Sequence, residues 1–352
     1  MIMAKKLKIA LLAPFEEPVP PRQYGGTERV VFNIAEELIK LGHDVTLLAS
    51  GDSRTSAKLE ACVDKAVRVL PESVIPAIRQ GLSYAGLSKA LFIVSNNGFD
   101  ILHNHYGWQF LLFRDLFSCP VVTTLHGTLA EPTENYMHNR FREEPFVSIS
   151  DSQRKHSPKL NYVATVHNGI QVDRFTFNNK PKNYLAFLGR IHPQKGPEYA
   201  IKIAKLSNQK LIMAAKIDPL EIDYFKREIE PLIDGKQIQF IGEVDHKGKV
   251  ELLRNARALL SPIQWDEPFG LTNIESLACG TPVISMNRGS LPEIIINGEY
   301  GYLCSTITDA VNAVSKIDAI SRSKCRKYVE ENFSAKLMAE KYLEAYKKVL
   351  RK

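Results

Sequence analysis

The sequence predicts an α/β protein made of two doubly wound parallel sheets, and three observations support this fold class. Apolar runs typical of buried parallel strands alternate with amphipathic helical stretches along the chain. The chain has 352 residues, more than one ordinary hydrophobic core holds, so two domains are expected. The alternation occurs once in each half, on either side of a stretch that lacks core periodicity.

The first half begins with a strand–helix–strand unit. A buried strand is expected in LKIALLAPF, a helix in TERVVFNIAEELIKLGH, and a second strand in DVTLLAS. The helix carries one apolar stripe and is expected to end at Gly42. Further strands are expected in DILHNH, PVVTTLHG, FVSISDS and YVATVHNG.

The second half follows the same plan. Strands are expected in NYLAFLG, KLIMAA, QIQFIGEV, ARALLSPI and TPVISM, and helices in PEYAIKIAKLS and HKGKVELLRNA. We therefore expect domains at 1–168 and 183–332, joined by a linker at 169–182. Ligands of such sheets bind at the carboxyl ends of the strands, so two facing sheets would enclose one cleft.

Composition narrows the class of protein. Hydrophobic content of 44% and charged content of 24% are typical of a globular protein, and no apolar run approaches the ~18 residues of a membrane span. The five cysteines are odd in number and form no CxxC pair, which disfavours a disulfide framework and a zinc site. A cytoplasmic location is expected.

The net charge of +7 is concentrated at the C-terminal end, because residues 321–352 carry 10 Lys and Arg against 4 Asp and Glu. A solvated helix face is the favoured interpretation. Contact with an anionic membrane or with nucleic acid is the alternative.

Two glycine-containing stretches follow predicted strands. Gly25 and Gly26 precede a helix whose first N–H groups could bind an anion. GRIHPQKG places Arg190 and Lys195 five positions apart after a strand, and two such cations suit a diphosphate. The alternative is two solvated basic residues. Neither GxxxxGK[ST] nor GxGxxG occurs, which argues against a P-loop and an ordinary NAD domain.

A third stretch, EPFGLTNIE, holds two carboxylates eight positions apart. Its Pro and Gly place Glu267 in a loop, and Thr272 is expected to cap a helix that runs to Cys279. Glu275 could complete a capping box with Thr272, but that structural role leaves Glu267 unexplained. If the loop faces a ligand, the backbone N–H groups at its end can bind a phosphate.

EPFGLTNIE resembles the E-x7-E motif of retaining GT-B glycosyltransferases of family 4. Further motifs lie in the family's order: YGGTE, LHG, HNGIQVDRF, GRIHPQKG and ISMNRGSLPEII. The resemblance implies two Rossmann-like domains, with the acceptor on the first and the nucleotide-sugar donor on the second. It also implies that a helix at about 333–352 packs back on the first domain.

The resemblance assigns the donor-binding residues. Glu267 would bind the sugar hydroxyls and Glu275 the ribose, while Arg190 and Lys195 would neutralise the diphosphate. His126, in LHG, would contact the donor sugar. The remaining donor-side candidates are Gly26, Lys216, Phe269, Gly270 and Leu271. Lys216 could equally be a solvated residue.

The acceptor side is less defined. His105 and Tyr24 are acceptor-facing candidates, and the loops 15–24 and 129–145 belong to the domain where family members bind acceptors. A metal pair of His103 and His105 is disfavoured, because no third ligand is evident.

We therefore expect a retaining hexosyltransferase that needs no divalent metal or other cofactor, since cationic side chains would do the work of the ion. A UDP-sugar is favoured as donor over a GDP-sugar. A front-face mechanism, in which the diphosphate leaves from the same face of the sugar that the acceptor attacks, is favoured over double displacement. The acceptor could be a lipid-linked sugar, a saccharide or a small molecule, with peripheral contact at the inner membrane face left open and no nucleic acid expected. The alternatives are a nucleotide-sugar epimerase on the same fold and a membrane- or nucleic-acid-binding module that uses the basic tail.

Overall fold

The computed structural model describes residues 6–23, 25–71 and 75–351. The chain divides into two compact units. Unit 1 comprises Met1–Gly169 together with Ala335–Lys352, and unit 2 comprises Ile170–Ser334. The last helix of the chain thus belongs to the same unit as the first strand.

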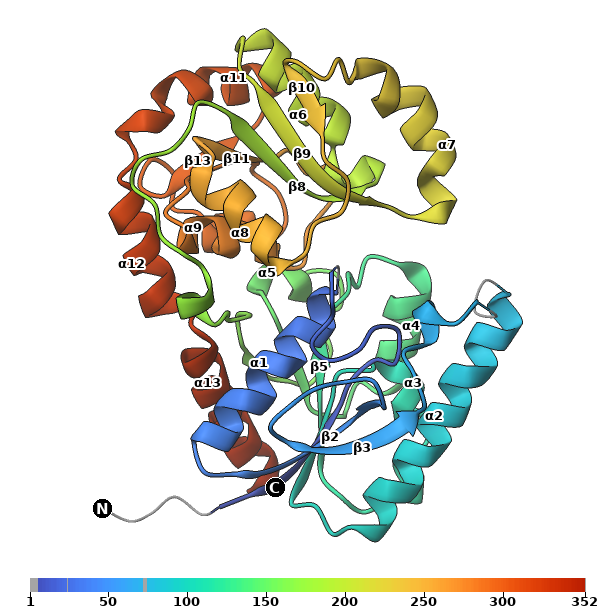
Figure 1. The fold of residues 1–352 in the computed structure, drawn as a ribbon. Helices are drawn as coiled ribbons and strands as arrows, with labels where there is room; N and C mark the ends of the chain where they lie inside the picture. Colours follow the sequence, from blue (N-terminus) through green and yellow to red (C-terminus); the bar gives the residue numbers. More distant parts are fainter. Residues whose placement is uncertain (1–5, 24, 72–74, 352) are drawn as a thin grey trace. The chain divides into compact units, whose positions relative to one another are not determined.

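Unit 1 is built on a parallel sheet (Figure 1), which among the described residues has seven strands in the order β3-β2-β1-β4-β5-β6-β7. The order reverses after β1, which is the doubly wound arrangement. The strands are β1 Lys8–Leu12, β2 Asp44–Ser50, β3 Lys58–Val63, β4 Ile101–Asn104, β5 Val121–Leu125, β6 Phe146–Ser148 and β7 Tyr162–Thr165.

The helices of unit 1 cover this sheet. They are α1 Gly26–Lys40, α2 Pro76–Asn96, α3 Trp108–Leu111, α4 Pro132–Arg140, α5 Asp151–Arg154 and α13 Ala335–Leu350. The apolar stripe of α1 is buried, and α13 packs beside α1 (Figure 1). Strand β3 and helix α2 have no counterpart in the sequence prediction. β3 is mostly half-buried without clean alternation, and α2 includes Gly81 and Gly86, which weaken its helical signal.

Unit 2 repeats the plan with six parallel strands among the described residues, in the order β10-β9-β8-β11-β12-β13. The strands are β8 Leu185–Ile191, β9 Leu211–Ile217, β10 Ile238–Phe240, β11 Ala258–Ser261, β12 Val283–Met286 and β13 Gly301–Cys304. Two doubly wound, Rossmann-like units confirm the predicted fold class.

The helices of unit 2 include the two that carry the sequence motifs, α8 His246–Asn255 and α9 Leu271–Ala278. The others are α6 Pro197–Leu206, α7 Ile222–Tyr224, α10 Leu291–Ile294, α11 Ile307–Lys316 and α12 Arg322–Asn332. Most of the stretch at 169–182 is bonded to unit 2, because the N–H of Asn178 donates to the carbonyl of Cys279 and that of Lys182 to Asn255.

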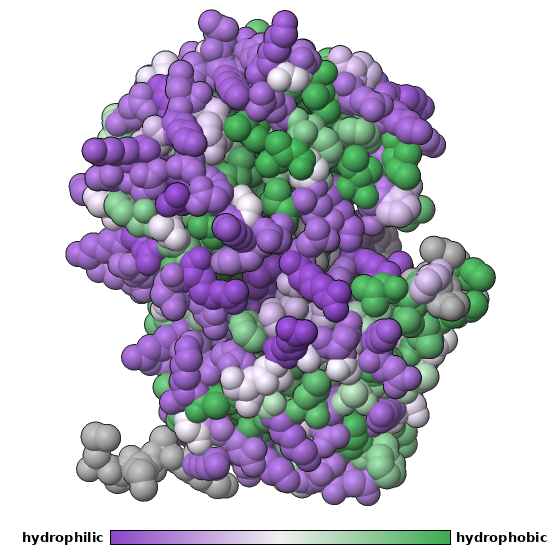
Figure 2. Space-filling view, viewed as in Figure 1, coloured by the Kyte–Doolittle hydropathy of each residue, from purple (hydrophilic) through white to green (hydrophobic). Residues whose placement is uncertain are grey.

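Hydrophilic residues cover most of the face seen in Figure 2, and hydrophobic residues gather near the start of α2, where Ile75 and Ile78 are exposed. All five cysteines are buried and free. Within the described part of the chain, no helix is both long and apolar enough to cross a membrane.

Candidate active site

Two cations lie at the carboxyl ends of neighbouring strands in unit 2. Arg190 is the penultimate residue of β8, and it is in register with Lys216, the penultimate residue of β9. Residues in register on adjacent parallel strands direct their side chains to the same face of the sheet. The sequence prediction placed Arg190 in a loop, whereas the structure continues the strand through it to Ile191.

Lys195, Trp265 and Glu267 form one cluster next to these strand ends. Lys195 lies in the short 3-10 turn after β8, and Glu267 lies in the loop after the neighbouring strand β11. Oε2 of Glu267 accepts from Nζ of Lys195 at 2.5 Å and from Nε1 of Trp265 at 2.9 Å. Nζ of Lys195 also lies 5.3 Å from the centroid of the Trp265 ring. Trp265 was not among the predicted site residues.

Close packing between the two loops holds this cluster. Gly196, directly after Lys195, has φ +66°, and a Cβ there would lie 2.2 Å from the carbonyl oxygen of Pro262. Only glycine therefore lets the turn approach the β11 loop so closely. The N–H of Gln264 donates to the carbonyl of Gln194 at 2.8 Å and ties the two loops together.

The loop of Glu267 leads into helix α9. Gly270 precedes the helix with φ +84°, and a Cβ on it would lie 2.6 Å from Nδ2 of Asn273. The helix begins at Leu271, so Thr272 lies inside the first turn and does not cap it, contrary to the sequence prediction. Gly270 takes the capping position because the chain needs a positive φ there. The first N–H groups of α9 have no acceptor within the helix and can bind an anion.

Glu275 is almost fully buried, with a relative exposure of 2%, and its partner is Lys249 of α8. Nζ of Lys249 donates to Oε1 of Glu275 and lies 5.4 Å from the centroid of the Phe175 ring. The capping-box role considered for Glu275 is wrong, since its carboxylate pairs with a lysine. Lys249 was missed, although it lies on one helical stripe with Leu252, Leu253 and Ala256.

In unit 1 His105 and His126 lie at the carboxyl ends of β4 and β5, and Gly26 begins the helix that follows β1 in the chain. Gly26 is the first residue of α1, and Gly25 is its N-cap. His105 directly follows β4, and its N–H donates to the carbonyl of Leu12 at 2.9 Å. His126 directly follows β5. Tyr24 lies outside the described residues.

His105 and His126 are hydrogen bonded to each other, with Nδ1 of His105 2.8 Å from Nε2 of His126. The His105 ring also stacks near that of His103, at a centroid distance of 3.8 Å. His103 is bonded to Thr124 of β5 and to Tyr346 of α13, at 2.7 Å in each case. Residues far apart in sequence thus form one buried cluster.

The histidines of this cluster are neutral. Burial lowers the pKa of His126 to about 4, and burial also holds the pKa values of His103 and His105 well below their usual range. Each ring can then donate one hydrogen bond and accept one.

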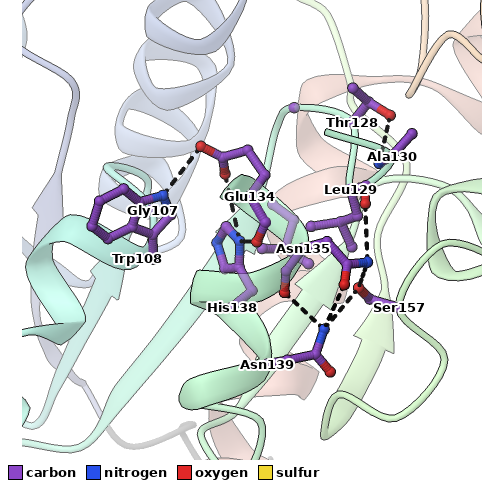
Figure 3. Close-up of polar contacts among 12 residues, drawn as sticks. Gly107, Trp108, Thr128, Leu129, Ala130, Glu134, Asn135, His138, Asn139 and Ser157 are labelled. Atoms are coloured by element: carbon purple, nitrogen blue, oxygen red, sulfur yellow. Dashed lines mark hydrogen bonds and ion pairs between the residues drawn. The ribbon is translucent and has the colours of Figure 1, made fainter. Parts of the chain in front are cut away.

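The segment at 129–145, expected from the sequence to lie on the acceptor side, contains helix α4, which is fixed by a network of polar contacts (Figure 3). Oε1 of Glu134 accepts from Nε1 of Trp108 at 3.1 Å, and Nδ2 of Asn135 donates to the carbonyl of His156 at 2.6 Å. His138 is buried in this network, with Nδ1 bonded to the carbonyl of Glu134. Tyr136 of the same helix is 65% exposed.

Within residues 6–23, 25–71 and 75–351, no group of three or more His, Cys, Asp or Glu side chains is placed to hold a metal ion. Both ring nitrogens of His103 are occupied by Thr124 and Tyr346.

Comparisons with known proteins agree with this architecture. Residues 24–174 match the model of Glycosyltransferase Family 4, and residues 170–335 match that of Glycosyl transferases group 1. A glycogen synthase of Mycobacterium tuberculosis is 25% identical, over 81% of this chain and 80% of the relative. Two solved structures share the fold over nearly the whole chain. A sucrose-phosphate synthase from Thermosynechococcus elongatus has a TM-score of 0.82 at 20% identity, covering 98% of this chain and 100% of that chain. Anabaena HepE in complex with UDP-glucose has a TM-score of 0.73 at 15% identity, covering 97% and 100%.

The two Rossmann-like units define a protein of the GT-B class. The two family matches together span residues 24–335, and the chain belongs to glycosyltransferase family 4, group 1. It is therefore an enzyme that transfers glycosyl groups, as its E-x7-E motif indicated.

Proposed function

We propose that the protein transfers a hexose from a nucleotide-diphosphate sugar to a hydroxyl acceptor, with retention of anomeric configuration and without a divalent metal. A UDP-sugar is the favoured donor, and a GDP-sugar is the second choice. HepE, which shares the fold, was crystallised with UDP-glucose, and this supports the class of donor. The acceptor is a lipid-linked sugar, a saccharide or a small molecule.

One observation carries the proposal: cations converge where two neighbouring strands of unit 2 end. Arg190 and Lys216 are in register on β8 and β9, and Lys195 follows β8 within bonding distance of Glu267. A diphosphate bound there would meet guanidinium and ammonium groups, together with the N–H groups that begin α9. These groups would stabilise the charge that develops on the leaving diphosphate.

In the proposed reaction, the bond from the anomeric carbon to the diphosphate oxygen breaks. The bond to the acceptor oxygen then forms on the same face, and the acceptor's proton passes to the departing phosphate. Glu267 is proposed to bind sugar hydroxyls rather than attack the anomeric carbon, because Lys195 and Trp265 already donate to its Oε2. Its second oxygen is left to accept from a sugar. Double displacement through Glu267 is the rival mechanism.

Glu275 is proposed to bind the ribose hydroxyls, with Lys249 holding its carboxylate. His126 of unit 1 is proposed to contact the donor sugar as a neutral hydrogen-bonding group, since its pKa lies near 4. Five free, buried cysteines favour work in a reducing compartment.

Thermal unfolding with UDP, GDP, ADP and UDP-glucose, each with and without EDTA, tests the donor. A ligand at 100 times its Kd stabilises by about 2.7 kcal/mol, which raises the melting temperature by several degrees. We expect a shift with UDP that EDTA leaves unchanged. A shift that EDTA abolishes would overturn metal independence, and no shift with any nucleotide would overturn the donor assignment.

The variant used in this experiment should not leave one charge of the buried Glu275–Lys249 pair without its partner. Glu275→Ala would leave Lys249 buried without its partner and would confuse binding with stability. The double variant Glu275→Gln/Lys249→Gln removes both charges, and it should fold while losing the shift with UDP.

Release of UDP separates transfer from epimerisation. A transferase given UDP-glucose and an acceptor mixture releases UDP and forms a glycoside whose anomeric proton has the donor's configuration. An epimerase would convert the sugar while it stays attached to UDP. Inversion at the anomeric carbon would overturn retention.

A further inference from the structure

A buried cluster surrounds His126, and its other members are His103, His105, Thr124, Tyr342 and Tyr346. The hydrogen bonds within this cluster indicate which ring nitrogens and hydroxyl groups carry the protons. Oγ1 of Thr124 donates to the hydroxyl oxygen of Tyr342 at 3.1 Å, so the same Oγ1 is left to accept from Nε2–H of His103. Nδ1 of a neutral His103 is then an acceptor, and it takes the hydroxyl proton of Tyr346. His103 is satisfied at both nitrogens in a single tautomer.

The pair His105–His126 has two arrangements, because either ring can donate across the 2.8 Å bond. If His126 donates, the proton of neutral His105 lies on Nε2. That nitrogen is buried and has no hydrogen-bond partner among the described residues. An orphaned N–H in the interior is rarer and less favourable than an orphaned acceptor. The favoured arrangement is therefore the one in which His105 donates from Nδ1 and keeps a bare lone pair on Nε2.

We propose that His105 is a positioning residue that fixes His126 in its Nδ1–H tautomer. The Nε2 lone pair of His126 accepts from His105, so Nδ1–H of His126 is the group offered to a ligand. His126 then acts as a neutral hydrogen-bond donor and never as a general base. That the ligand is the donor sugar rests on the proposed function, but the tautomer itself does not.

Packing explains why His105 holds this position. Its ring lies against that of His103, which Thr124 and Tyr346 hold from two sides. Its own N–H is bonded to the carbonyl of Leu12 at the end of β1. Both ring and backbone of His105 are thus fixed before any ligand arrives, as a positioning group requires.

Nitrogen NMR of histidine-labelled full-length protein tests the tautomer directly, without substrate. Long-range proton–nitrogen correlations distinguish a protonated from a bare ring nitrogen. The His126 signals are identified by their loss in His126→Asn. We expect His126 to carry its proton on Nδ1 and His105 to carry its own on Nδ1 from pH 6 to 8. A proton on Nε2 of His126 would overturn the proposal, whatever the enzyme transfers.

Two variants of nearly equal size test the positioning role. His105→Asn places an amide nitrogen near the former Nδ1 and can still donate to His126, whereas His105→Gln places its amide near the former Nε2 and cannot. We expect the Asn variant to keep His126 in the Nδ1–H tautomer and to keep kcat within about threefold of the native value. We expect the Gln variant to lose the single tautomer of His126 and to lower kcat by at least about tenfold, with little change in KM. Equal kcat values in two folded variants would overturn the role. If neither these variants nor the native chain transfers sugar while the NMR result holds, only the proposed function fails.

Discussion

The two units place very different chemistry at the ends of similar sheets. Unit 2 carries paired charges, with Glu267 bound to Lys195 in the loops after two strands and Glu275 bound to Lys249 between helices α9 and α8. In unit 1 the strand ends carry His105 and His126, whose pKa values burial lowers until they are neutral.

This difference agrees with the proposed function, in which unit 2 binds the diphosphate and unit 1 contacts the sugar. Charged side chains suit a diphosphate and its departure, where electrostatic stabilisation is strongest. Neutral rings suit a sugar, whose hydroxyls need direction rather than charge. A fold that leaves its strand ends free can carry either set.

The largest effect is expected from the buried charge pair of Lys249 and Glu275 in unit 2. Lys249→Met keeps the aliphatic volume but leaves Glu275 buried without its partner, so the free energy of unfolding should fall by about 3–5 kcal/mol in urea titrations. Lys247→Met, exposed on the same helix, is the control. Equal small losses in both variants would mean that the pair is not a buried charge pair, and adding Glu275→Gln to Lys249→Met should restore most of the stability.

The cations proposed for the diphosphate come next. Arg190→Ala and Lys195→Ala should each lose on the order of 2–4 kcal/mol of transition-state stabilisation, measured from kcat/KM for sugar transfer. Lys202→Ala, on the exposed side of α6, should leave kcat/KM unchanged. An effect below about tenfold at either Arg190 or Lys195 would remove the diphosphate assignment.

The neutral side of the comparison predicts a pH dependence of stability. Each buried histidine has a folded pKa below its unfolded value of 6.5, so its contribution is complete above pH 6.5 and is lost as pH falls toward 4. The expected slope is about 1.4 kcal/mol per pH unit for each histidine. Glu28, whose pKa burial raises to about 7, acts in the opposite sense over this range.

The lowered pKa values of His43, His138 and His192 act in the same sense as those of the cluster, so the free energy of unfolding should rise between pH 5 and pH 6.5 against the opposing effect of Glu28. Urea titrations at half-unit steps measure this slope, and His126→Asn should reduce it. A flat or falling profile would show that the cluster is already charged at pH 5.

The smallest effect is expected from the basic tail. Three exposed lysines lie on α13, namely Lys336, Lys341 and Lys347. Changing each of them to Gln should alter the free energy of unfolding by less than about 0.5 kcal/mol. The variants should still transfer sugar. Vesicles with and without anionic lipid measure any membrane contact of the triple variant. Loss of transfer together with loss of vesicle binding would give the tail a functional role.

The sequence predicted most successfully the proximity of site residues that closely follow the end of a strand. Lys195 and Glu267 follow strands that are neighbours in a doubly wound sheet, so their proximity could be expected from strand order. The cap of α9 was misassigned because Thr272 has the right chemistry for a cap, while the decisive factor was the positive φ at Gly270.

What the sequence could not predict depends on contacts between distant segments. His103 and Tyr346 are 243 residues apart, and nothing local to either one indicates the other. Lys249 had a usable signal, because it lies on an apolar helical stripe where a lysine needs a buried anion. The identity of that anion still required the fold.

The return of α13 to unit 1 has a consequence for how the chain is made. Unit 2 is continuous in sequence, whereas unit 1 lacks one of its helices until α13 has been synthesised. Until Tyr342 and Tyr346 dock, the hydroxyl partners of Thr124 and His103 are missing, and the surroundings of His126 are incomplete. The surroundings of His126 are therefore complete only after α13 has been synthesised and has packed on unit 1.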